Sequence, residues 1–60
     1  MIPLTRLSGE RFLLNADLIR TAEARPDTFL TLTTGERLVV REPPETVAGR
    51  ILGWRRAAAS

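Results

Sequence analysis

The same twelve-residue pattern occurs twice in this chain, once in each half. Residues 4–15 read LTRLSGERFLLN and residues 30–41 read LTLTTGERLVVR, so that Leu, Thr, Gly, Glu and Arg recur 26 positions apart. In each copy a Ser-Gly or Thr-Gly pair separates two β-prone runs, and glycine adopts the positive φ of a tight turn without steric penalty. The pattern therefore predicts one β-hairpin in each half, whether the repeat reflects an internal duplication or only the features that hairpins share.

The predicted fold class is mainly β, of the α+β type: a small antiparallel sheet of two β-hairpins plus a linking strand, with one C-terminal α-helix. The expected elements of this single domain, residues 1–60, are a hairpin over 2–15, a connecting strand over 18–25, a hairpin over 28–42 and a helix over 44–57. Residues 18–24 are ambiguous between strand and short helix. We favour a strand that follows a single helical turn, because Pro26 disfavours helix at Arg25.

The helix is the element with the clearest start. Pro43 and Pro44 suit a first turn, where backbone N–H groups have no partner within the helix, and Glu45 complements the positive end of the helix dipole. An apolar stripe of helical period follows, and it consists of Val47, Ala48, Ile51, Trp54 and Ala58.

The chain is too small to bury a large core. A domain of 60 residues buries only about 60% of its unfolded surface, and small domains usually need disulfides, a metal or oligomerisation. The sequence contains neither Cys nor His, so disulfides are excluded and the usual zinc ligands are missing. We therefore expect a homo-oligomer with no cofactor and no metal. The lack of Cys is also consistent with a cytoplasmic location.

Two aliphatic triplets, Phe12-Leu13-Leu14 and Leu38-Val39-Val40, point apolar groups to both faces of their strands. One helix covers only one face of a small sheet, so the other face needs a second copy of the chain or a sheet that curls like a small barrel. Exposed aliphatic groups forgo about 1.5–3 kcal/mol each in burial. The candidate self-association residues are Phe12, Leu13, Leu14, Leu38, Val39, Val40 and Trp54. Trp is frequent in interface hot spots, but the place of Trp54 in the stripe of Val47 and Ile51 favours packing in the core or between subunits over a role as a partner anchor.

Positive charge is concentrated at the C-terminal end of the chain. The formal net charge is +2, all nine basic residues are Arg, and Arg50, Arg55 and Arg56 lie in a segment without acids. These three residues are candidates for contact with a protein, anionic lipid or RNA, although a solvated helix end has the same composition. Gly49 and Gly53 have the spacing that lets helices approach closely, and we interpret it as tight packing of the helix on the sheet.

The sequence does not predict an enzyme. Without His, Cys, Lys or Tyr, acid–base chemistry would fall to carboxylates such as Glu10 and Glu36, which occupy equivalent turns and are expected to face solvent. No glycine loop suited to phosphate is present. The start of the chain has no signal-peptide pattern, and apolar runs reach only three residues, so contact with a membrane is expected to be at most peripheral.

The chain closely resembles the FlbD/SwrD family of small flagellar proteins over residues 2–56. That family shows I-x-L-T-R-L-N-G, F-x-L-N-x-D-L-I, P-D-T-x-I-T-L-T-x-G and a V-x-E strand end. The matching residues of the first half are Ile2, Leu4, Thr5, Arg6, Leu7, Gly9, Phe12, Leu14, Asn15, Asp17, Leu18 and Ile19. Those of the second half are Pro26, Asp27, Thr28, Thr31, Leu32, Thr33, Gly35, Val40 and Glu42. Ser8 replaces the usual Asn, and the helix is rich in Gly and Arg rather than Glu and Lys.

The resemblance implies a non-catalytic accessory protein of bacterial flagellar motility. It would support torque through contacts with motor or stator proteins at the inner face of the membrane. The alternative is a small β-rich RNA-binding translational regulator, because the M-I-x-L-T-R start is similar to that of carbon-storage-type regulators. With one Trp, two Phe and no Tyr for base stacking, nucleic acid is the less favoured partner.

Overall fold

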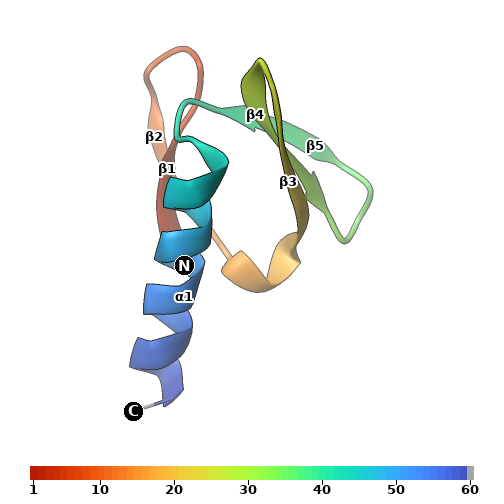
Figure 1. Ribbon diagram of the computed structural model, residues 1–60. Coiled ribbons are helices and arrows are strands. Elements are labelled where there is room, and N and C mark those ends of the chain that lie inside the picture. The colour runs from red at the N-terminus through yellow and green to blue at the C-terminus, as the bar shows by residue number, and fades with distance from the viewer. Residues whose placement is uncertain (60) are drawn as a thin grey trace.

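The computed structural model describes residues 1–59, which form two small antiparallel sheets and one C-terminal helix (Figure 1). The elements are β1 (Ile2–Thr5), β2 (Arg11–Leu14), the 3₁₀ turn η1 (Ala16–Leu18), β3 (Ile19–Arg25), β4 (Asp27–Leu32), β5 (Arg37–Val40) and α1 (Pro44–Ala59). The predicted α+β class, with antiparallel hairpins and a C-terminal helix, is confirmed.

The two copies of the repeated pattern form hairpins of identical register. β1 pairs with β2 and β4 pairs with β5, and every pair in the second hairpin lies 26 residues after its counterpart in the first. The outermost pairs are Ile2–Leu14 and Thr5–Arg11 in the first hairpin, and Thr28–Val40 and Thr31–Arg37 in the second. The sequence repeat is therefore also a structural repeat.

The turns of the two hairpins agree as closely as their strands. Gly9 and Gly35 have φ values of +96° and +91°, in the region that favours glycine. The Gly9 N–H donates to the Arg6 carbonyl at 2.9 Å, and the Gly35 N–H donates to the Leu32 carbonyl at 3.0 Å. The Ser-Gly and Thr-Gly pairs thus have the role that the sequence assigned to them.

The ambiguous segment is a helical turn followed by a strand. The Asn15 side chain caps η1 by accepting a 3.1 Å hydrogen bond from the Asp17 N–H. β3 then pairs antiparallel with β4, with an irregularity in register between Ile19 and Thr21. Instead of one sheet there are two, β1-β2 and β3-β4-β5, and a single bridge between Arg6 and Val40 joins them.

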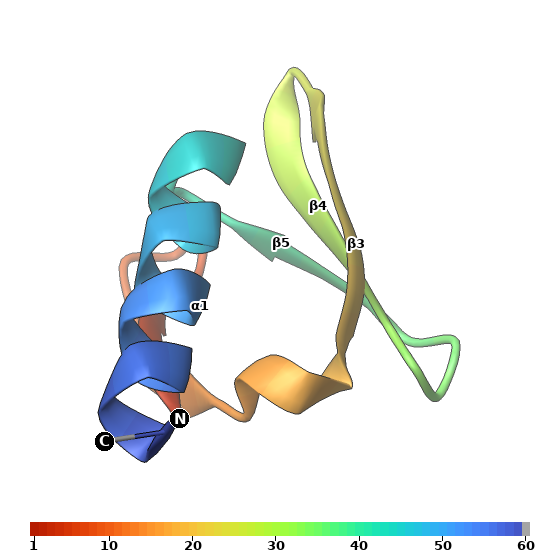
Figure 2. The ribbon, with the colours of Figure 1, turned by 60° about the horizontal axis from the view of Figure 1, so that its bottom comes forward.

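The core lies where the two sheets and the helix meet. Figure 2 shows α1 on one side and the three-stranded sheet on the other, with η1, which links β2 to β3, at the base. The fully buried members of the core are Ile2, Leu4, Ala16, Leu30, Val40 and Val47. Phe12, Leu14, Ile19, Leu38, Ile51 and Trp54 pack against this cluster while partly exposed.

The helix begins at the predicted Pro44 and continues to Ala59, two residues beyond the predicted end. Val47 is buried and Ile51 and Trp54 are half-buried, as the apolar stripe predicts. Ala48 and Ala58, which also belong to the apolar stripe, are exposed, because the buried stripe is narrower than the apolar one. Within residues 1–59, no helix is long and apolar enough to cross a bilayer.

Candidate functional site

An open groove of about 350 Å³ separates β3 from α1. The strand side consists of four consecutive residues, Ile19 to Ala22, and the helix side extends from Pro44 to Arg55. Val47 and Ile51 are core residues that form the floor of the groove, whereas Leu52 at its rim is 54% exposed. The groove is therefore a mainly apolar surface that the chain itself leaves uncovered.

The fold creates this groove because β3 is an edge strand of its sheet and lies opposite α1. In the strand order β3-β4-β5, one side of β3 pairs with β4 and the other has no strand beside it. All residues of β3 after Ile19 are exposed. Side chains alternate between the faces of a strand, so four consecutive lining residues show that the groove runs along the edge of β3.

Two arginines, Arg20 and Arg55, line the groove, and none of its described lining residues is acidic. Both side chains are exposed. The salt bridges of residues 1–59 lie elsewhere, and they are Arg6–Glu10, Arg25–Glu23 and Arg50–Glu42. The groove thus combines an apolar floor with two positive charges that have no acidic partner in the described chain.

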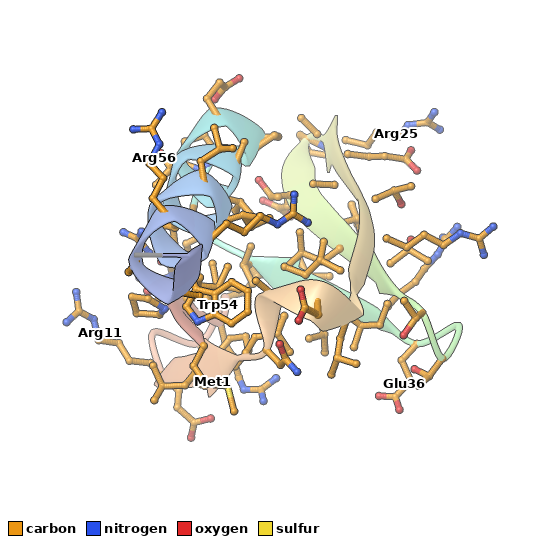
Figure 3. All side chains as sticks on the ribbon, turned by 90° about the horizontal axis from the view of Figure 1, so that it is seen from below. Met1, Arg11, Arg25, Glu36, Trp54 and Arg56 are labelled. Atoms are coloured by element: carbon orange, nitrogen blue, oxygen red, sulfur yellow. The ribbon has the colours of Figure 1, made fainter. Side chains whose placement is uncertain are left out.

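The three arginines predicted from the sequence to contact a partner, Arg50, Arg55 and Arg56, have different environments. Arg50 is used internally, because its Nη1 donates to the Pro3 carbonyl at 2.6 Å and to Glu42 Oε2 at 3.1 Å. Arg55 lines the groove. Arg56 is exposed, and Figure 3 shows it extending away from the molecule. Of these three arginines, only Arg55 both lines the groove and forms no salt bridge within the described chain.

Glu42 is a structural carboxylate that connects β1 to the segment before α1. Its Oε1 accepts from the Thr5 N–H at 2.9 Å and its Oε2 from Thr5 Oγ1 at 2.8 Å. Thr28 Oγ1 donates to the Glu42 carbonyl at 2.5 Å. Burial would raise the pKa of Glu42, but the hydrogen bonds from Thr5 and Arg50 outweigh it and lower the pKa.

The aliphatic triplets of β2 and β5 alternate in and out rather than exposing whole apolar faces. Val40 is 1% exposed within its own chain, so its side chain is not available to a second copy in this conformation. Phe12, Leu14 and Leu38 pack against the core. Only the middle residue of each triplet faces outward: Leu13 is 65% exposed, and Val39 is half-buried.

Trp54 packs against the core and is half-buried. Figure 3 shows its ring turned inward beside α1, in contrast to Arg11 and Arg56, which extend outward. This is the packing alternative that the sequence left open for Trp54. Its partly exposed surface is the only part that a second copy could cover.

The interpretation of Gly49 and Gly53 as sites of tight packing is wrong. A Cβ atom built at either position meets nothing within 4 Å. Both glycines lie on an exposed face of α1, and neither is required for contact with the sheets. Spacing alone could not show which helix face they occupy.

The outer face of the three-stranded sheet has a smaller hollow of about 250 Å³. Phe29 lies in it and pairs across the strands with Val39 on one side and Glu23 on the other. Thr31, Arg25 and Arg37 complete its lining. This surface mixes both signs of charge around one aromatic ring, so it selects less clearly for a partner than the groove does.

Sequence reasoning missed the groove and Phe29. The groove depends on the position of β3 at a sheet edge opposite α1, which no local pattern encodes. The small residue Ala22 in β3 is a weak signal, because small side chains leave room on a surface. Glu42 could have been singled out more easily, because it is the Glu of the V-x-E strand end in the family pattern. Glu10 and Glu36 are exposed at the turns, as expected.

Residues 1–59 contain no group of three or more acidic, His or Cys side chains placed to hold a metal ion. The family model described as "FlbD: Flagellar and Swarming motility proteins" matches residues 1–59. No curated protein and no solved structure matches the chain.

Proposed function

The chain belongs to the FlbD family of flagellar and swarming motility proteins, and on this premise we propose that it is a non-catalytic accessory of the flagellar motor. It acts by binding, and it supports torque through contact with a motor or stator protein. Its place of action is the inner face of the membrane, where it associates peripherally through its partner.

The groove between β3 and α1 is the observation that carries this proposal. A small chain gains stability by burying apolar surface, yet this one leaves about 350 Å³ of mainly apolar groove open to solvent. Concave apolar surfaces with a few polar groups are typical binding sites. Concave apolar surface that the fold leaves uncovered beside its core is best explained by a role in binding.

Self-association is the second part of the proposal. Leu13 is 65% exposed on the outer face of the β1-β2 sheet, directly opposite Pro3 in the register. Leu7 is 46% exposed beyond the end of β1. A second copy that covers this surface would remove from water the aliphatic groups that the fold leaves outside its core.

Deletion of the gene tests the motility role. We expect a strain without it to assemble flagella but to swim slowly in medium of raised viscosity, with recovery when the gene is supplied in trans. Tethered-cell rotation under load measures torque directly. Normal torque in the deletion strain would contradict the proposal, and specific retention of RNA by the purified protein would favour the translational regulator instead.

Light scattering of the purified protein tests self-association. We expect a solution mass above 6.7 kDa that returns towards the monomer in Leu13→Glu, while the matched surface variant Thr33→Glu leaves the mass unchanged. A monomeric wild-type protein at high micromolar concentration would remove self-association and leave partner binding intact.

A further inference from the structure

We propose that the groove between β3 and α1 binds a short amphipathic helix of another protein, with leucine-like side chains on one face and carboxylates beside them. This inference rests on the proposed binding function and specifies the chemistry of the partner. The partner is acidic because the charged groups of the groove are Arg20 and Arg55. The floor of the groove includes Val47 and Ile51, so the partner helix must present an apolar face to it.

The charge argument is one of complementarity. Neither Arg20 nor Arg55 forms a salt bridge within the described chain, and no acidic residue among the described ones lines the groove. Opposite charges across an interface steer association and select against partners of the wrong sign. A basic partner would meet two uncompensated arginines and be rejected.

Both arginines lie towards the same end of the groove. Figure 2 shows β3 starting beside η1, level with the C-terminal half of α1, and then running in the opposite direction to the helix. Arg20 is the second residue of β3, and Arg55 belongs to the last third of α1. The carboxylates of the partner therefore belong near one end of its helix.

A helical partner fits this groove better than an added strand. Regular strand addition needs an unbroken edge, but the register of β3 is irregular between Ile19 and Thr21, within the groove. The groove extends from Pro44 to Arg55 along α1, which corresponds to about 17 Å at 1.5 Å per residue. That length accommodates about three turns of a partner helix, which would present apolar side chains at i, i+3, i+4 and i+7.

Two synthetic peptides test the proposal on the full-length protein. The first is a three-turn helix with leucines at i, i+3, i+4 and i+7 and glutamates flanking them near one end. The second is identical except that lysine replaces each glutamate. With ¹⁵N-labelled protein, we expect the acidic peptide to shift the amide resonances of Thr21, Ala22, Ala48 and Leu52, and to bind at least tenfold more tightly than the basic one.

Charge reversal provides the matched variants. Arg20→Glu/Arg55→Glu should weaken binding of the acidic peptide at least tenfold and should bind the lysine peptide in its place. Arg37→Glu/Arg56→Glu makes the same change in net charge, from +2 to −2, at two exposed arginines outside the groove, and should change the affinity less than threefold. Thermal melts establish that both variants are folded.

The proposal is overturned if the wild-type protein binds neither peptide, binds both equally, or shows its resonance shifts away from the groove. Equal loss of affinity in the two double variants would also overturn it, because net charge alone would then explain the binding. In cells, normal torque with Arg20→Glu/Arg55→Glu in a strain whose gene deletion impairs motility would remove the groove as the binding site and leave the proposed function standing. Normal torque in the deletion strain would remove the function itself.

Discussion

β1 and β4 occupy the same position in two hairpins of identical register, but their outer edges are closed in different ways. β3 pairs along the outer edge of β4. Along β1, the Thr5 N–H donates to Glu42 and the Pro3 carbonyl accepts from Arg50. The Arg41 N–H donates to the Thr5 carbonyl at 2.9 Å, beside the single bridge between the sheets. One edge is thus closed by a strand and the other largely by two ionic side chains.

This difference shows that the repeat determines each hairpin but not what borders it. Pro3 occupies the position that Phe29 has in the second hairpin. Because proline has no backbone N–H, the outer edge of β1 has one donor fewer that needs a hydrogen-bond acceptor. The remaining groups of β1 are satisfied by residues far along the chain. The edge of β4 depends on backbone hydrogen bonds, whereas that of β1 depends on a carboxylate and is therefore sensitive to substitution and pH.

The largest expected effect follows from removing that carboxylate. Glu42→Ala leaves the Thr5 N–H without its acceptor and Arg50 with only the Pro3 carbonyl, and hydrogen bonds to charged groups contribute about 1.5–3 kcal/mol. We expect the free energy of unfolding to fall by about 2–3 kcal/mol in urea titrations. The control, Glu36→Ala at an exposed turn, should change it by less than about 0.5 kcal/mol. Equal effects would mean that Glu42 does not hold β1.

The same carboxylate makes the stability depend on pH. Because the pKa of Glu42 is lowered in the folded protein, its contribution is present above its ordinary value of 4.5 and is lost as the pH falls through the folded pKa. We expect the melting temperature of the wild-type protein to fall more steeply below pH 4.5 than that of Glu42→Gln. Parallel curves for the two proteins would contradict the assignment.

The turns should respond equally, because they are the part in which the hairpins agree. Gly9→Ala and Gly35→Ala each place a Cβ at a φ near +90°, which costs about 1–2 kcal/mol. The new Cβ at Gly9 would meet the Arg41 side chain at 3.8 Å, an ordinary contact, and at Gly35 it would meet nothing within 4 Å. Chemical denaturation of both variants measures the difference, and a gap above about 1 kcal/mol would show that the turns are not equivalent.

The smallest effect is expected at the outward residues of the two triplets. Val39 lies opposite Phe29, and such cross-strand pairs contribute about 0.2–1 kcal/mol, so Val39→Thr should destabilise by up to about 1 kcal/mol. Leu13 lies opposite Pro3 and is 65% exposed, so Leu13→Thr should have an effect below about 0.5 kcal/mol in the monomer. A larger loss at Leu13, measured at rising protein concentration, would indicate that a second copy covers it.

Local chemistry explains the parts of the fold that the sequence could predict. The hairpins follow from two glycines between β-prone runs, and α1 follows from Pro44 at its start and the stripe of Val47, Ile51 and Trp54. The family match confirmed the resemblance that these segments carry. The aliphatic triplets predicted apolar groups on both faces of their strands, and the alternation of side chains places Leu13 and Val39 outward and the flanking residues towards the core.

The remainder depends on contacts between residues distant in sequence. Arg50 meets Pro3 across 47 positions, so composition alone could not distinguish it from Arg55, which faces the groove. The groove itself exists because the sheet divides in two and leaves β3 at an edge. A periodic pattern reports which face of a helix is apolar, but it does not report what lies opposite that face.

The bonds between Pro3, Thr5, Glu42 and Arg50 also set an order of events during synthesis. β1 leaves the ribosome before the residues that complete its hydrogen bonding, because Glu42 follows Thr5 by 37 positions and Arg50 follows Pro3 by 47. A nascent polypeptide halted before Glu42 therefore carries a first hairpin with an unfinished flank. β1 therefore reaches its final state only after Glu42 and Arg50 have been made.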